Sequence, residues 1–211
     1  MTLSFAALPA LALLAAPALA QDDGGLYLEL GAGLTSTESM PGLIGDAAFD
    51  TGSSFNGLIG YEWQDAWAGL NLGLEFEGLW TLQNFEDELL GSGSSLAEDF
   101  TTSAYLFGPK LTWPYSEEIS FYGGLGVGFT TELGIKSRGD AASAFKVVDE
   151  ETLLYQAKAG IRYNMGANLS WYLQYRHVVA DTVEVEDDFL LQSFDYDFEQ
   201  DLLEVGMRYG F

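Results

Sequence analysis

Alternation of apolar and polar residues is clearest in the segment Leu202-Leu203-Glu204-Val205-Gly206-Met207-Arg208-Tyr209-Gly210-Phe211. From Leu203 onward every second residue is apolar, and the residues between them are charged or glycine. A period of two residues predicts a β-strand with one apolar face and one polar face. Such a strand fits the closing strand of a barrel with a lipid-facing exterior and a polar lumen. A soluble antiparallel strand is the alternative that this segment leaves open.

Seven further segments show the same alternation. In one of them Leu169, Trp171, Leu173 and Tyr175 share a face. Glycine and aromatic residues are frequent inside these segments, which disfavours helices and favours strands. With the terminal segment, the predicted strands are 26–34, 55–63, 69–80, 101–113, 119–133, 152–163, 169–179 and 202–211.

The connections between the predicted strands are alternately short and long. In outer-membrane barrels the short turns are periplasmic and the long loops are extracellular. We therefore predict an all-β fold, an eight-stranded antiparallel transmembrane up-and-down β-barrel, with both termini on the periplasmic side. The predicted turns are 64–66, 114–118 and 164–168, and the predicted long loops are 35–54, 81–100, 134–151 and 180–198.

The aromatic residues fall near the ends of the predicted strands. Trp63, Trp67, Trp113 and Trp171 all lie beside predicted short turns. Two belts of amphipathic rings are typical of the two membrane–water interfaces. A soluble barrel offers no reason for this placement, so the aromatic pattern favours the membrane barrel.

Residues 1–20 predict a secretory signal peptide. An apolar run over 3–16 is followed by Ala18 and Ala20, at the two positions that a signal peptidase reads, although no Lys or Arg precedes the run. The run is too short for a transmembrane helix, which needs about 20 apolar residues. The predicted barrel domain is therefore 21–211. The chain contains no Cys, so neither a lipid anchor nor a disulfide is expected.

Several segments resemble the eight-stranded outer-membrane barrels related to the membrane domain of outer membrane protein A and to the opacity-type surface proteins. The terminal strand resembles the C-terminal assembly signal of such barrels, with the signal positions Leu203, Val205, Met207, Tyr209 and Phe211. The other segments that carry the resemblance are 121–128, 157–163 and 171–176.

The resemblance implies a location and partners. We expect the chain in the outer membrane of a Gram-negative bacterium after signal-peptide cleavage, in contact with outer-membrane lipid and lipopolysaccharide, and as a monomer. Periplasmic chaperones and the barrel assembly machinery are the expected partners during export. No peptidoglycan-binding domain is expected after the eighth strand. The family shares a fold more than an activity, so the resemblance leaves the function open.

The charge balance is extreme, with 8 basic against 32 acidic residues, which argues against a nucleic-acid partner. Strand parity points ten charged side chains into the lumen, which an eight-stranded barrel leaves just wide enough to fill. We predict a network of salt bridges there, with Tyr122, Gln156, Tyr172 and Gln174 as further members. The alternative is that these residues line a narrow pore. The ten residues are Glu29, Glu62, Glu75, Glu77, Lys110, Lys158, Arg162, Arg176, Glu204 and Arg208.

The excess negative charge must then lie outside the lumen. Carboxylates gathered in a loop could bind Ca²⁺ or Mg²⁺, but the spacing does not match a calcium-binding hand, and we expect a solvated acidic loop instead. The predicted loop 180–198 and the residue that follows it hold Asp181, Glu184, Glu186, Asp187, Asp188, Asp195, Asp197 and Glu199.

The sequence offers no catalytic, cofactor-binding or metal-binding motif. His177, the single histidine, is predicted to face outward. Outer-membrane lipid A deacylases resemble this placement, but their pattern has a Ser two residues after the His, where this chain has Val179. We therefore expect a non-enzymatic structural or surface-interaction barrel with a filled lumen. A narrow channel for small solutes or ions and a surface adhesin are the alternatives.

Overall fold

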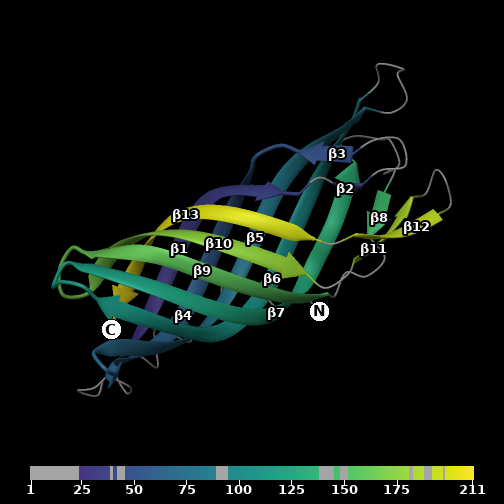
Figure 1. Ribbon diagram of the computed structural model, residues 1–211. Coiled ribbons are helices and arrows are strands. Elements are labelled where there is room, and N and C mark those ends of the chain that lie inside the picture. Colours follow the sequence, from purple (N-terminus) through teal and green to yellow (C-terminus); the bar gives the residue numbers. More distant parts are fainter. Residues whose placement is uncertain are drawn as a thin grey trace.

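Eight long antiparallel strands wrap into a closed barrel (Figure 1). The computed structural model describes residues 24–38, 40–41, 46–88, 95–137, 145–147, 152–180, 183–187, 192–196 and 198–211. The predicted signal peptide lies outside these residues. The barrel strands are β1 (Gly24–Thr37), β4 (Gly52–Trp67), β5 (Leu70–Glu88), β6 (Ser95–Pro114), β7 (Ile119–Ser137), β9 (Leu153–Asn164), β10 (Leu169–Ala180) and β13 (Glu199–Gly210).

The barrel closes between its first and last strands. β1 pairs with β13 from Tyr27 opposite Gly210 to Thr37 opposite Gln200, and every other barrel strand pairs with its neighbours in the chain. The predicted fold class is therefore confirmed. No helix in the described part of the chain is long and apolar enough to cross a membrane.

The alternating side chains separate as the sequence predicts. Outward residues such as Leu30, Leu125 and Leu203 are more than half exposed on the barrel surface, whereas Glu29 and Glu204 beside them in sequence are buried. An exposed apolar band on the outside of a closed barrel is the surface that lipid covers.

Two of the three predicted short turns are correct, and the first is displaced. β4 runs through 64–66 to Trp67, and the turn is Ala68–Gly69, both with positive φ, of 53° and 81°. Positive φ at both central residues is typical of a two-residue hairpin turn. The Asp65 carboxylate accepts a hydrogen bond from the Gly69 amide at 3.0 Å. The register also shifts between Trp63 and Trp67, an irregularity that alternation alone does not reveal.

The long connections contain more strand than predicted, so their boundaries need correction. Most of 81–100 is β-structure, because β5 continues to Glu88 and β6 begins at Ser95. Beyond the apolar band a strand no longer needs an apolar outer face, so the alternation fades although the pairing continues. The other connections contain the short strands β2 (Met40–Pro41), β3 (Asp46–Phe49), β8 (Phe145–Val147), β11 (Val183–Asp187) and β12 (Gln192–Tyr196).

Two kinds of side chain fill the extracellular part of the lumen. The rings of Phe100 and Phe198 lie 5.8 Å apart between their centroids and are fully buried. The Gln200 amide donates to Thr37, Thr81 and Gln83 at 3.1–3.2 Å. The charged residues lie below this layer, toward the short turns.

Candidate functional site

Ten charged side chains meet inside the barrel. The acids come from β1, β4, β5 and β13, and the bases come from β6, β9, β10 and β13. Nine of the ten residues are buried, and the side chain of Arg208 is 11% exposed. The structure thus places every charged residue of the predicted lumen set in one interior cluster, in which each of them has an ion-pair partner.

Arg176 connects strands from different sides of the lumen. Its Nε lies 3.0 Å from Glu204 Oε2, a terminal nitrogen pairs with Glu77, and Nη1 donates to Gln156 Oε1 at 2.7 Å. Arg176 and Glu204 are both 0% exposed. Glu204 also accepts from Gln174 Nε2 at 2.7 Å, so its charge is compensated on several sides.

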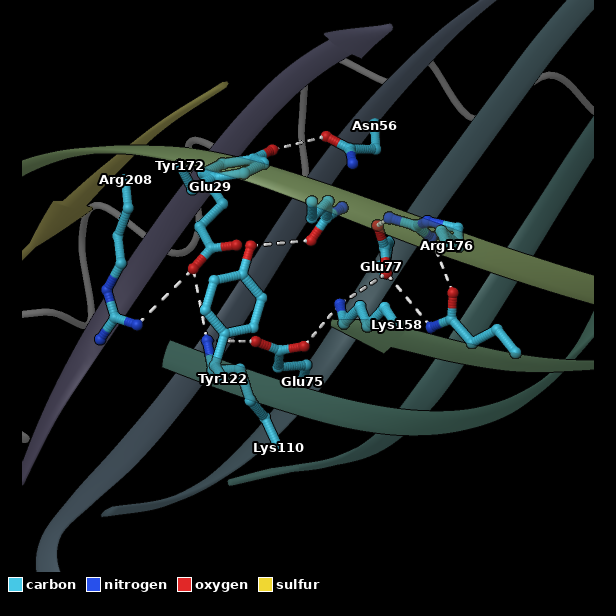
Figure 2. Close-up of polar contacts among 12 residues, drawn as sticks. Glu29, Asn56, Glu75, Glu77, Lys110, Tyr122, Lys158, Tyr172, Arg176 and Arg208 are labelled. Atoms are coloured by element: carbon cyan, nitrogen blue, oxygen red, sulfur yellow. Dashed lines mark hydrogen bonds and ion pairs between the residues drawn. The ribbon is translucent and has the colours of Figure 1, made fainter. Parts of the chain in front are cut away.

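The ammonium groups of two lysines lie among the lumen carboxylates (Figure 2). Lys158 Nζ lies 2.7 Å from Glu75 and 3.1 Å from Glu77. Lys110 Nζ lies 2.5 Å from Glu75 and 3.3 Å from Glu29. Lys110 also lies 3.9 Å from Glu62, so it bridges three carboxylates, whereas Lys158 bridges two. Removing one acid would therefore leave a buried ammonium with fewer partners.

The network becomes richer in donors toward the short turns. Arg208 Nη1 lies 3.1 Å from Glu62 and 3.6 Å from Glu29, and Arg162 Nη1 lies 3.4 Å from Glu62. Glu62 also accepts from Thr112 Oγ1 at 3.1 Å. One carboxylate therefore serves two guanidinium groups at this level.

Three inward tyrosines, Tyr27, Tyr122 and Tyr172, lie against glycines. The Tyr122 hydroxyl donates to Gln174 at 3.0 Å, and the Tyr172 hydroxyl donates to Asn56 at 3.1 Å. A Cβ at Gly31 would lie 2.2 Å from the Tyr172 hydroxyl. Glycine at such positions leaves room for rings to cross a narrow lumen.

Some members of the network were missed in the sequence. Tyr27 is fully buried, donates to Glu75 at 2.5 Å, and lies under Lys110 and Arg208, whose charged groups are 4.2 and 3.5 Å from its ring centroid. Asn56 donates to Glu204 at 3.1 Å. Tyr27 has the same inward parity as Glu29, so the alternation of β1 also predicts it in the lumen.

The short-turn end of the lumen opens into a cavity of about 790 Å³. Glu62, Arg162 and Arg208 from the network line it, together with polar side chains that include Ser120 and Ser170. In the described part of the chain, no three His, Asp or Glu side chains lie together as metal ligands would.

A second polar cluster lies on the outside of the barrel. Tyr175 and His177 on β10 both contact the Asp201 carboxylate on β13, at 2.5 and 2.9 Å. The side chains of His177 and Asp201 are 39% and 54% exposed. His177 is opposite Asp201 on one side and Ala157 on the other. Asp201 therefore orients the imidazole through this contact.

The sequence matches the outer membrane protein beta-barrel domain family over residues 6–211. The chain belongs to this family. Membership agrees with the lipid-facing band and the closed barrel, and it places the protein in the outer membrane of a Gram-negative bacterium. No functionally curated protein matches the sequence significantly.

Solved outer-membrane barrels share the fold of this family member at low sequence identity. OprG from Pseudomonas aeruginosa aligns with a TM-score of 0.60 and 13% identity, covering 90% of this chain and 97% of OprG. Neisserial surface protein A aligns with a TM-score of 0.53 and 12% identity, covering 90% of this chain and 100% of that protein. The attachment invasion locus protein Ail of Yersinia pestis aligns with a TM-score of 0.51 and 18% identity, covering 90% of this chain and 99% of Ail. At these identities the likeness shows the fold alone.

Four of the five predicted signal positions lie on β13, the last strand of this family member, and the fifth follows it directly. Leu203, Val205, Met207 and Tyr209 are 44–53% exposed on the outer face of β13. Phe211 follows β13, and its amide donates to the Leu26 carbonyl at 3.0 Å. These contacts place the segment at the seam where β1 and β13 close the barrel.

Proposed function

We propose that this outer-membrane barrel is a closed scaffold that presents acidic extracellular segments to the medium. The single observation that supports closure is the position of Arg176, which is fully buried and bonded to acids on β5 and β13. An ion that passed this level would have to separate Arg176 from Glu77 and Glu204. Leaving such buried charges without partners costs on the order of 3–5 kcal/mol.

Conductance in planar lipid bilayers tests this proposal. We expect no stable openings from the wild-type protein. The double variant Arg176→Gly/Glu204→Gly should conduct, since it removes one charge of each sign and much of the side-chain volume at this level. The double variant Leu173→Gly/Val205→Gly, whose substituted positions are paired on the lipid-facing side of the same two strands, is the matched control and should stay silent.

A different result would identify the alternative function. Stable wild-type openings with a conductance that changes in Arg162→Ala would mean that the lumen is a narrow pore. In that case the network would line a solute path, and the closed-scaffold proposal would be wrong.

An interaction role is proposed for the extracellular side. β8, β11 and β12 form a separate three-stranded sheet that stands beyond the barrel wall (Figure 1). Its register puts Glu184 opposite Asp195 and Glu186 opposite Lys146, and β11 ends at Asp187, so acids outnumber bases in this sheet. A partner that matches this sheet carries positive charge. The eight-stranded scaffold of Ail, an attachment protein by name, supports the idea that such barrels present loops for contact.

Deletion of 183–196 tests the interaction role. The cut should spare Ala180 and Phe198, since both are buried and the Ala180 amide donates to the Phe198 carbonyl at 2.9 Å. We expect the shortened barrel to keep its heat-modifiable gel migration and to lose binding of a polylysine probe. Unchanged polylysine binding by a folded deletion variant would exclude this sheet as the interaction surface.

We also propose that the barrel assembly machinery reads the outward face of β13, after delivery by periplasmic chaperones, and that the inserted barrel is monomeric. Deleting Phe211 should lower the amount of heat-modifiable barrel in the outer membrane without changing synthesis of the chain. Chemical cross-linking in outer membranes should give one species at the monomer mass.

A further inference from the structure

The cavity at the short-turn end has features of a binding site. In outer-membrane barrels this end faces the periplasm. The volume of about 790 Å³ lies within the usual range for small-molecule sites, roughly 300–1,000 Å³. Arg162 and Arg208 are the two basic side chains among its lining residues. In a chain with a formal net charge of −24, two guanidinium groups beside an open cavity need an explanation.

The floor of the cavity, formed by the network residues Glu62, Arg162 and Arg208, holds more hydrogen-bond donors than acceptors. Arg162 reaches Glu62 through two long contacts, of 3.4 and 3.5 Å. The same carboxylate accepts from Arg208, Thr112 and Asn71 at 3.1, 3.1 and 3.4 Å. Each guanidinium carries five N–H groups, and the carboxylates within reach are Glu62 for both arginines and Glu29, at 3.6 Å, for Arg208.

Arg162 has a donor with no acceptor. Its Nε is buried and makes no hydrogen bond, although the side chain is only 9% exposed. An unsatisfied donor on a buried charged group is costly and therefore rare. The Glu62 carboxylate therefore does not use up the donors of this guanidinium.

The walls suit an anion that carries polar substituents. Ser120, Ser170 and Asn164 line the cavity with hydroxyl and amide groups. The Ser170 hydroxyl donates to Asn164 at 2.9 Å and the Asn164 amide donates to the Glu117 carbonyl at 3.0 Å, so these two would have to exchange partners to bind a ligand. Asp65 and Glu117, also among its lining residues, are exposed to solvent. Water screens these carboxylates, whereas the buried guanidinium groups act through a lower dielectric constant. The floor is therefore expected to dominate the local field.

We propose that this cavity binds a small oxyanion from the periplasm, a carboxylate or a phosphate group, between Arg162 and Arg208. The planar guanidinium fork matches both groups with paired hydrogen bonds. This site is independent of whether the lumen conducts, because it opens on the periplasmic side of the network.

Solution NMR of the whole barrel in detergent micelles tests the proposal. Phosphate and acetate are titrated separately at constant pH and ionic strength, with chloride as the replaced anion. We expect saturable shifts of the Arg162 Nε–Hε signal and of the Ser120 and Ser170 amides. Binding of phosphate alone assigns a phosphate ligand, binding of acetate alone assigns a carboxylate, and competition between them assigns a shared site. Absence of saturable shifts with both anions would overturn the proposal and leave the cavity filled with water.

Three variants make the test specific. Arg162→Gln should weaken binding about ten-fold or more, as expected for the loss of a charged hydrogen-bond partner. Asp65→Asn should strengthen binding about two-fold, because a repelling charge is removed across a water-like medium. Glu118→Gln, in the same turn as Glu117 but outside the cavity lining, should leave the affinity unchanged.

The outcomes remain decisive if Arg162→Gln does not fold. Asp65 is exposed, and an Asn keeps the oxygen that accepts from Gly69, so this variant should fold. Equal affinities of the wild type and Asp65→Asn, with saturable shifts spread over other parts of the barrel, would show that the anion binds elsewhere and would contradict the assignment.

Discussion

Arg176 makes contacts to side chains on three other strands. Glu77 lies on β5, Glu204 on β13 and Gln156 on β9. Because the guanidinium is fully buried, water cannot replace a lost partner. Each acid around it therefore matters to the fold as a whole, which is unlike the behaviour of exposed ion pairs.

Glu77→Gln should destabilise the barrel by about 3–5 kcal/mol, since it keeps the side-chain volume and removes the charge that faces Arg176 and Lys158. Urea unfolding in phospholipid vesicles, followed by Trp fluorescence, measures the loss. The exposed turn variant Glu118→Gln is the control and should change the free energy of unfolding by no more than about 0.5 kcal/mol. Equal losses in the two variants would mean that the network contributes nothing specific.

At the scale of single elements, β6 and β7 approach each other unusually closely. A Cβ at Gly128 on β7 would lie 1.9 Å from the Tyr105 carbonyl oxygen, and one at Gly108 on β6 would lie 1.8 Å from the Leu125 carbonyl oxygen. The obstacle in both cases is backbone, which cannot rotate away as a side chain can. The two strands therefore depend on glycine at these positions.

Gly128→Ala should destabilise the barrel by about 1–3 kcal/mol, because the strands must separate to admit the methyl group. Gly123→Ala on the same strand is the matched control. Its Cβ would meet the Lys158 carbonyl oxygen at 3.7 Å, an ordinary contact, so this change should be neutral or stabilising by up to about 1 kcal/mol. Thermal gel-shift midpoints of the two variants give the comparison, and a more stable Gly128→Ala would contradict the close approach of the strands.

The whole molecule is organised around its two surfaces, one facing lipid and one facing the lumen. Leu125 lies in the outward band and is 64% exposed, whereas Tyr115 lies in a short turn, where Trp113 and Phe121 complete an aromatic cluster. The cost of a charge on the outer face depends on its depth in the bilayer.

Leu125→Arg should therefore cost about 2–4 kcal/mol of stability in lipid vesicles, and Tyr115→Arg at the interface should cost about 0–1 kcal/mol. Both are measured by urea unfolding in the same vesicles. A larger loss for Tyr115→Arg would place the bilayer at a different height on the barrel.

Local pattern was enough to predict the eight strands, their direction and the face of each side chain. A strand alternates its side chains whatever it packs against, so Glu204 and Val205 are assigned to opposite faces without any knowledge of their neighbours. The same reasoning failed where the alternation fades: 81–88 and 95–100 continue as strand above the apolar band, and the turn at Ala68–Gly69 follows a register shift.

Tertiary structure decided which groups meet. Lys110 and Glu29 are 81 positions apart, and Arg208 and Glu62 are 146 apart, so parity places them in one lumen but does not pair them. The cavity beside Arg162 likewise depends on closure, and the contact of His177 with Asp201 depends on the register of β10 against β13. The sequence by itself determined the barrel and its polarity, because alternation is a property of neighbouring residues. Only the closed barrel decided the ion pairs and the cavity, because its strand register sets which distant side chains share the same height.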